Sequence, residues 1–175
     1  MISNCGHDEN GRYSGGMPGD QTGQEYCVRT WFDRPWGCVL RHTDKQVGLE
    51  LAKVAIAAAN NRHIGYNQMR RGTYYIELKL AGWEPSKIKR NCEADCSSST
   101  CANVIAVGHR LKKKKLQSIS PALTTSSLKA ALKAAGFEVL TDEKYRKKED
   151  HLMPGDILLL EGHHVAINVT KGKMA

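Results

Sequence analysis

The chain has 175 residues, of which 41% are hydrophobic and 25% are charged. This length suits one domain with its own hydrophobic core and is short for two, so we expect a single domain over residues 1–175. No apolar run reaches the length of a membrane span, and the polar, glycine-rich start has no apolar segment typical of a signal peptide. We therefore expect synthesis in the cytoplasm, without an export route of its own.

The net charge is +8, which favours polyanionic partners such as nucleic acid, an anionic membrane or an anionic bacterial cell wall. The densest basic runs are residues 112–115 and 144–148. No zinc finger, ribonucleoprotein motif or glycine-rich phosphate loop accompanies them. We interpret the charge as a solvated basic face and do not predict a nucleic-acid partner from it.

Residues 1–25 carry six glycines among polar residues, which predicts an ordered loop. Residues 34–42 can form a short strand. Thr43 and Gln46 then have the spacing of a capping box, which predicts the start of a helix. Apolar residues repeat along one face of this helix up to Asn60 and Asn61: Val47, Leu51, Val54, Ala55 and Ala58.

A second helix is predicted from Asp95 or Cys96 to about Gly108, and a third over residues 126–135. A strand over 137–140 follows, and a Pro-Gly turn then precedes two strands, 156–160 and 163–169, joined by a tight connection. Helices come first in this pattern and an antiparallel sheet follows, so the predicted fold class is α+β.

Three of the six cysteines lie within ten residues of each other: Cys92, Cys96 and Cys101. They could be metal ligands, disulfide partners, buried packing or a nucleophile. Their spacings differ from the paired spacings of zinc sites, so we predict no metal. Cytoplasmic synthesis favours free thiols over structural disulfides.

Cys96 differs from its neighbours because it opens a predicted helix and is followed by small hydroxyl residues, SSST. The N–H groups and the dipole at a helix N-terminus favour a thiolate and can also stabilise an oxyanion. Cys101 falls on the predicted core face and is interpreted as packing, while Cys92 has no assigned role. Cys96 is therefore the candidate nucleophile.

A cysteine nucleophile needs a base, usually a histidine on rigid structure. His164 lies on a predicted strand, and its neighbour His163 should face the opposite side and pack inward or against a neighbouring helix. Asn168 shares a face with His164 but lies about 13 Å along the strand, too far to contact the ring. A buried core histidine is the alternative interpretation for His164, and no residue is assigned to orient it.

These residues resemble the NlpC-type cysteine peptidases, which share a papain-like core with CHAP amidase domains. The similarity rests on three motifs and on IGYNQ at 64–68: Asp95-Cys96-Ser97, Pro154-Gly155-Asp156 and His164-Val165. The segments GGMPGDQTGQE and RPWGCVLRH are similar to the opening of phage-encoded lysins of Gram-positive hosts. The double glycine usual after the tyrosine segment is absent, and the position of the usual third polar residue falls at or past Ala175.

The resemblance implies a peptidoglycan hydrolase with a papain-like fold that cuts an amide of the peptide stem, with Cys96 as nucleophile and His164 as base. It further implies that Tyr66, Asp95 and Ser97 bind the stem peptide; Asp20 and Gln21 are further candidates for the cleft. No cofactor is implied. The expected partners are peptidoglycan and anionic wall polymers, reached after release from the cell.

Three alternatives remain open at this point. The same dyad could cut the amide between the sugar and the first alanine, or it could act in acyl transfer. A third alternative is a basic nucleic-acid-binding protein without enzymatic activity. The chain could also be the catalytic part of a longer lysin with a separate wall-binding module.

Overall fold

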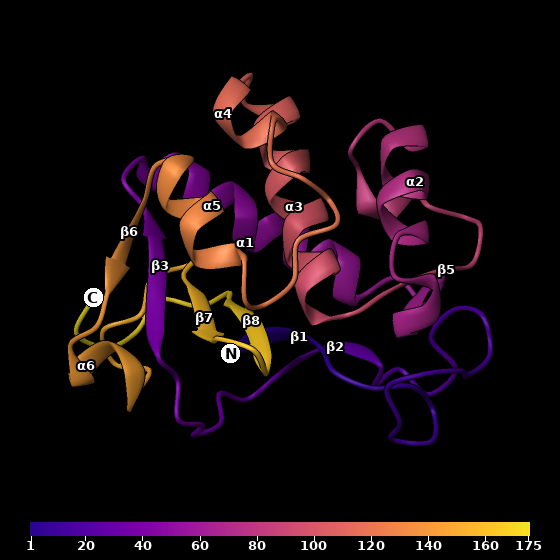
Figure 1. Ribbon diagram of the computed structural model, residues 1–175, viewed down its shortest axis with the longest axis horizontal. Helices are drawn as coiled ribbons and strands as arrows, with labels where there is room; N and C mark the ends of the chain where they lie inside the picture. Colours follow the sequence, from indigo (N-terminus) through magenta and orange to yellow (C-terminus); the bar gives the residue numbers. More distant parts are fainter.

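A computed structural model of the protein describes all residues 1–175 (Figure 1). The strands are β1 (Ile2–Cys5), β2 (Tyr26–Arg29), β3 (Cys38–His42), β4 (Ile64–Tyr66), β5 (Cys92–Ala94), β6 (Phe137–Leu140), β7 (Ile157–Leu160) and β8 (His164–Asn168). The helices are α1 (Lys45–Ala59), α2 (Thr73–Leu80), α3 (Cys96–Arg110), α4 (Lys114–Gln117), α5 (Leu128–Ala134) and α6 (Glu143–Arg146), with short 3-10 turns η1 (Gln68–Arg70) and η2 (Pro85–Lys87).

The main sheet has six strands in the order β2-β1-β8-β7-β3-β6, and every neighbouring pair is antiparallel. A separate two-stranded parallel sheet joins β4 and β5. The predicted α+β class is confirmed. The predicted order of helices before strands is wrong, because three strands precede α1.

The prediction that residues 1–25 form only a loop is also wrong. All four residues of β1 are buried, and β1 lies between β2 and β8 in the sheet. The strand is too short for its periodicity to stand out beside the glycine-rich segment that follows. Its pairing with β8 brings the start of the chain to the strand that carries His164.

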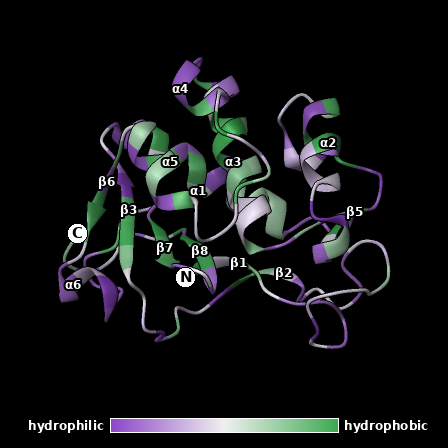
Figure 2. Ribbon diagram, viewed as in Figure 1, coloured by the Kyte–Doolittle hydropathy of each residue, from purple (hydrophilic) through white to green (hydrophobic).

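Helices α1 and α3 cover one face of the sheet, and α5 packs on β6 and β3 (Figure 1). Alternate strand residues face these helices, including Leu40, Leu159 and Val165. Figure 2 shows β7, β8 and much of α3 in green, which matches their place in this core. The opposite face buries a smaller cluster around Trp36, with Leu158 among its members. The sheet is thus covered on both faces, as burial of β7 and β8 requires.

The starts of the two long helices differ in how well the sequence predicted them. The N-cap of α1 is Asp44, whose carboxylate accepts from the Gln46 N–H, so the predicted capping box at Thr43 is wrong by one residue. At α3 the prediction is confirmed: Asp95 is the N-cap and forms a capping box with Ser98. The helix continues two residues past Gly108, to Arg110.

The Pro154-Gly155-Asp156 turn fixes the approach to β7. A Cβ on Gly155 would come within 2.2 Å of the Gly48 backbone, and its φ of +87° suits glycine. The buried Asp156 carboxylate accepts from the Met153 N–H and from two nitrogens of Arg41, at 2.8 and 2.6 Å. The motif therefore has a structural role, which is to hold α1, β3 and β7 together.

All four lysines of the first run and Lys144, Lys147 and Lys148 of the second are exposed, in agreement with solvated basic surfaces, while Arg146 is half-buried. The first run overlaps α4 and the second overlaps α6, and these two helices lie at different ends of the molecule (Figure 1). The positive charge is therefore spread over separate surfaces and does not form one continuous binding stripe.

Candidate active site

Cys96 is the first residue of α3 and lines a cavity of about 550 Å³. His164, the first residue of β8, and Asn4, on the adjacent strand β1, line the same cavity. All six cysteines are free thiols, and Cys96 is the only one that is not fully buried. The structure thus brings the candidate nucleophile and the candidate base to one solvent-accessible site.

Burial and charge both act on the Cys96 thiol. Burial raises its pKa to about 11, and the nearby Asp95 carboxylate adds to the rise. The backbone N–H groups of Val165, Ser97 and Cys96 itself oppose it by hydrogen bonding to the sulfur. The thiol therefore keeps its proton at neutral pH in the free protein, with N–H groups from both α3 and β8 close to it.

His164 is held on two sides. Its Nε2 lies 2.6 Å from Oδ1 of Asn4, and because a carbonyl oxygen can only accept, Nε2 carries the proton. The ring centroids of Trp36 and Phe32 lie 6.0 and 6.5 Å from that of His164. The imidazole is therefore fixed in position, and its Nδ1 is the nitrogen left without a proton.

Burial lowers the pKa of His164 to about 4, and the positive charges of Arg34 and Arg29 lower it further in the same direction. The imidazole is thus neutral at neutral pH. A protonated thiol and a neutral imidazole are the starting state for general-base activation, in which the proton leaves sulfur as the sulfur attacks.

The expectation for His163 is wrong. His163 lies in the turn before β8, where its N–H donates to the Leu160 carbonyl, and its side chain is exposed. The strand starts one residue later than predicted, so the alternation of faces does not extend to His163. Its side chain lines the cavity beside His164 and does not pack into the core.

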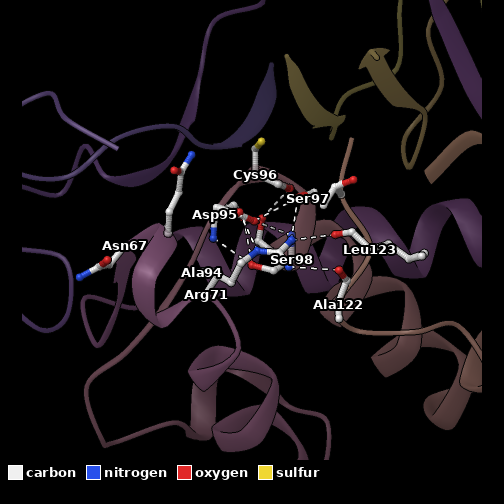
Figure 3. Close-up of polar contacts among 12 residues, drawn as sticks. Asn67, Arg71, Ala94, Asp95, Cys96, Ser97, Ser98, Ala122 and Leu123 are labelled. Carbon is white, nitrogen blue, oxygen red and sulfur yellow. Dashed lines mark hydrogen bonds and ion pairs between the residues drawn. The ribbon is translucent and has the colours of Figure 1, made fainter. Parts of the chain in front are cut away.

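Asp95 and Ser97 are bonded within the protein, as Figure 3 shows. Asp95 accepts from Arg71 Nε at 2.7 Å, from the Ser98 N–H at 2.8 Å and from the Ser97 hydroxyl at 3.1 Å. Arg71 also donates to Ser97 Oγ and to the carbonyls of Ala122 and Leu123. The Cys96 side chain points away from this network (Figure 3). The network anchors the start of α3 to the segment after α4.

The other three predicted binding residues are placed differently. Tyr66, at the end of β4, lines the cavity, and its hydroxyl accepts from Gln68 Nε2 at 3.2 Å. Asp20 is buried and its carboxylate accepts from the Thr22 and Gly23 N–H groups, which closes a turn. Gln21 is exposed. Neither Asp20 nor Gln21 lines the cavity that contains Cys96.

Sequence reasoning missed Asn4 and Arg71. Asn4 stands in a segment predicted as loop, and the strand that carries it reaches β8 only through the tertiary fold. Arg71 follows the IGYNQ segment within a few residues, but its partners are up to 52 residues away. A strand pattern in ISNC was the one available signal for Asn4.

The whole chain is covered by one family model. The model of the endolysin-like domain matches residues 2–175. The chain belongs to the endolysin-like domain family. Comparison with curated proteins gives no match, and comparison with solved structures gives none either. Membership indicates enzymatic lysis of the cell wall, with peptidoglycan as the substrate.

The endolysin-like domain has no group of three or more His, Cys, Asp or Glu side chains placed to hold a metal ion. None of its helices is both long and apolar enough to cross a membrane.

Proposed function

We propose that this endolysin-like domain is a cysteine hydrolase that cleaves an amide bond in the peptide stem of peptidoglycan. The observation that carries the proposal is the shared cavity of Cys96, His164 and Asn4, with Asn4 bonded to the ring nitrogen of His164. A helix-borne thiol beside a strand-borne imidazole is also the arrangement of a papain-like fold, which we propose for this domain.

In the first step, the Cys96 sulfur attacks the amide carbonyl carbon while its proton passes to Nδ1 of His164. The carbonyl oxygen becomes an oxyanion, which the backbone N–H groups at the start of α3 stabilise. The C–N bond then breaks, and His164 returns the proton to the leaving amine. A thioester on Cys96 remains.

In the second step, His164 takes a proton from water, and the hydroxide attacks the thioester carbonyl. The C–S bond breaks, the peptide leaves as a carboxylic acid, and the thiol regains its proton. Asn4 keeps Nδ1 directed at the sulfur through both steps. No metal or organic cofactor takes part in this scheme.

Substrate binding is proposed along the cavity. Tyr66 has direct access to it. Asp95 and Ser97 are bonded to Arg71. We therefore propose that they contribute to binding of the stem peptide indirectly, by fixing the position of the start of α3. For Asp20 and Gln21 we propose only an indirect role, through the shape of the N-terminal loop. The exposed basic runs would concentrate the enzyme on anionic wall polymers after its release from the cell.

The test is digestion of purified cell walls, followed by mass spectrometry of the released fragments. Stem cleavage leaves part of the peptide on the sugar and creates a new amine within the stem. Cleavage between the sugar and the first alanine releases the whole stem and would assign the amidase activity instead. Cys96→Ala serves as the inactive control, and a chelator arm tests for a metal. Loss of activity in chelator that zinc restores would contradict the cysteine mechanism.

A further inference from the structure

Two arginines at the cavity have no hydrogen-bonding or anionic partner within the protein. Arg29 ends β2, and Arg34 lies in the segment between β2 and β3; both line the cavity with Cys96 and His164. Both side chains are exposed, and neither forms an ion pair or a side-chain hydrogen bond. By contrast, the guanidinium groups of Arg41, Arg70, Arg71 and Arg110 each bind a carboxylate of the protein.

One aromatic ring, that of Phe32, lies near both arginines and near the proposed catalytic histidine. The guanidinium carbons of Arg29 and Arg34 lie 5.0 and 5.9 Å from the centroid of the Phe32 ring. Phe32 in turn lies 6.5 Å from the His164 ring. Because arginine stacks on aromatic rings through its planar face, Phe32 holds both cations beside the reacting groups while their N–H groups stay free.

The other charged groups of the lining leave this region positive. Asp33 is the only acidic residue that lines the cavity, and it forms no ion pair with either arginine. The other titratable residues that line the cavity are Cys96 and three histidines, His7, His163 and His164, together with the tyrosines Tyr13 and Tyr66. Two fixed positive charges and one negative charge therefore face the space that a substrate would occupy.

We propose that Arg29 and Arg34 bind a free carboxylate of the substrate, so that the enzyme prefers stem peptides with a carboxylate near the cleaved bond over the same peptides carrying a carboxamide. This inference rests on the proposed function and specifies the substrate class. A guanidinium presents paired N–H donors that match the two oxygens of a carboxylate, and a peptide carries such groups on acidic residues and at its C-terminus.

The same geometry links binding to catalysis. Arg34 and Arg29 are the charges that disfavour protonation of His164. A bound carboxylate offsets these charges, so the pKa of His164 rises when the correct substrate is present. A base whose pKa lies closer to the working pH is more effective. The preference for a carboxylate should therefore be visible in kcat as well as in KM.

The experiment uses two synthetic stem peptides that differ only in one group, carboxylate or carboxamide, near the cleaved bond. The wild-type protein should favour the carboxylate in kcat/KM by roughly tenfold or more, the scale of a hydrogen bond to a charged group. Arg29→Gln with Arg34→Gln should remove the preference, and Arg29→Lys with Arg34→Lys should keep part of it. As a control, Lys89→Gln with Arg90→Gln also removes two positive charges, but outside the cavity. This double variant should keep the full preference for the carboxylate peptide.

A binding measurement separates this inference from the proposed function. The inactive Cys96→Ala protein should bind the carboxylate peptide more tightly than the carboxamide peptide, and the double Gln substitution should abolish the difference. Equal binding and equal cleavage of the two peptides would overturn the carboxylate site while leaving the hydrolase intact. Selective binding without any cleavage by wild type would support the site and overturn the hydrolase. Absence of binding to both peptides would overturn both.

Discussion

Asn4 and His164 are 160 positions apart in the chain, yet Oδ1 of Asn4 accepts a hydrogen bond of 2.6 Å from Nε2 of His164. The contact exists because β1 pairs with β8 in the main sheet. It fixes the tautomer as well as the orientation of the imidazole, since Nε2 must carry the proton. The residue that is bonded to His164, the proposed base, thus comes from the first strand of the chain.

Asn4→Ala should lower kcat for wall lysis by about tenfold to a hundredfold, the scale expected for a misplaced catalytic group. KM should change little, because Asn4 orients the base. Ser3→Ala is the matched control, since Ser3 is the preceding buried residue of β1 and its hydroxyl donates to the Ala55 carbonyl on α1. If Ser3→Ala lost as much activity as Asn4→Ala at equal stability, the effect would belong to the strand and not to the histidine.

Cys96→Ser should remove nearly all lytic activity and leave the fold intact, because the hydroxyl is a far weaker nucleophile than the thiol. Cys92→Ser and Cys101→Ser should keep most of it, since both side chains are fully buried in the core. Both should lose some thermal stability instead, because a hydroxyl replaces an apolar packing group. Lysis rate and thermal midpoint of the three variants check this. A dead Cys92→Ser enzyme of normal stability would contradict the assignment.

His164→Ala should lower turnover by at least about 10²- to 10⁴-fold, the usual contribution of a general base. His163→Ala should change stability by less than about 0.5 kcal/mol, as is usual for an exposed residue. The two adjacent substitutions are therefore a matched pair, measured by lysis rate and thermal midpoint. A fully active His164→Ala enzyme would rule out the dyad.

The rate of Cys96 alkylation by iodoacetamide should rise with pH across the neutral range without a plateau. The thiol pKa is raised to about 11, so the reactive thiolate fraction grows about tenfold per pH unit between pH 6 and 9. The unfolded protein, with thiols at the ordinary value, should react faster at pH 7. A plateau that begins below pH 7 would show a preformed thiolate and contradict the neutral dyad.

Stability should fall as the pH drops from about 6.5 to 4, partly because of His164. The folded pKa of about 4 lies below the ordinary 6.5, so between these values the unfolded state binds the proton and the folded state does not. The loss is on the order of 2–3 kcal/mol. Denaturant unfolding at pH 7 and pH 4.5 should show a smaller difference for His164→Gln than for wild type. An unchanged difference would mean that His164 does not titrate in this range.

Features set by neighbouring residues could be predicted from the sequence. The start of α3 depends on Asp95 and on a residue three positions later, and these contacts form wherever the segment is helical. The same is true of the end of α1 at Asn60 and of the turn before β7. These local signals placed Cys96 at a helix start and His164 on a strand. They also gave the α+β class, because that class follows from the kinds of elements present.

Contacts between distant residues were decided only by the tertiary structure. Asn4 reaches His164, and Arg71 reaches Asp95, through strand pairing and helix packing that no local pattern encodes. For the same reason Arg29 and Arg34 line the cavity with Cys96 and His164. A short buried strand such as β1 carries little periodic signal, and its partners are chosen by the packing of the whole sheet. The places of Cys96 at a helix start and of His164 on a strand could thus be predicted from local sequence, but the groups that contact them required the fold.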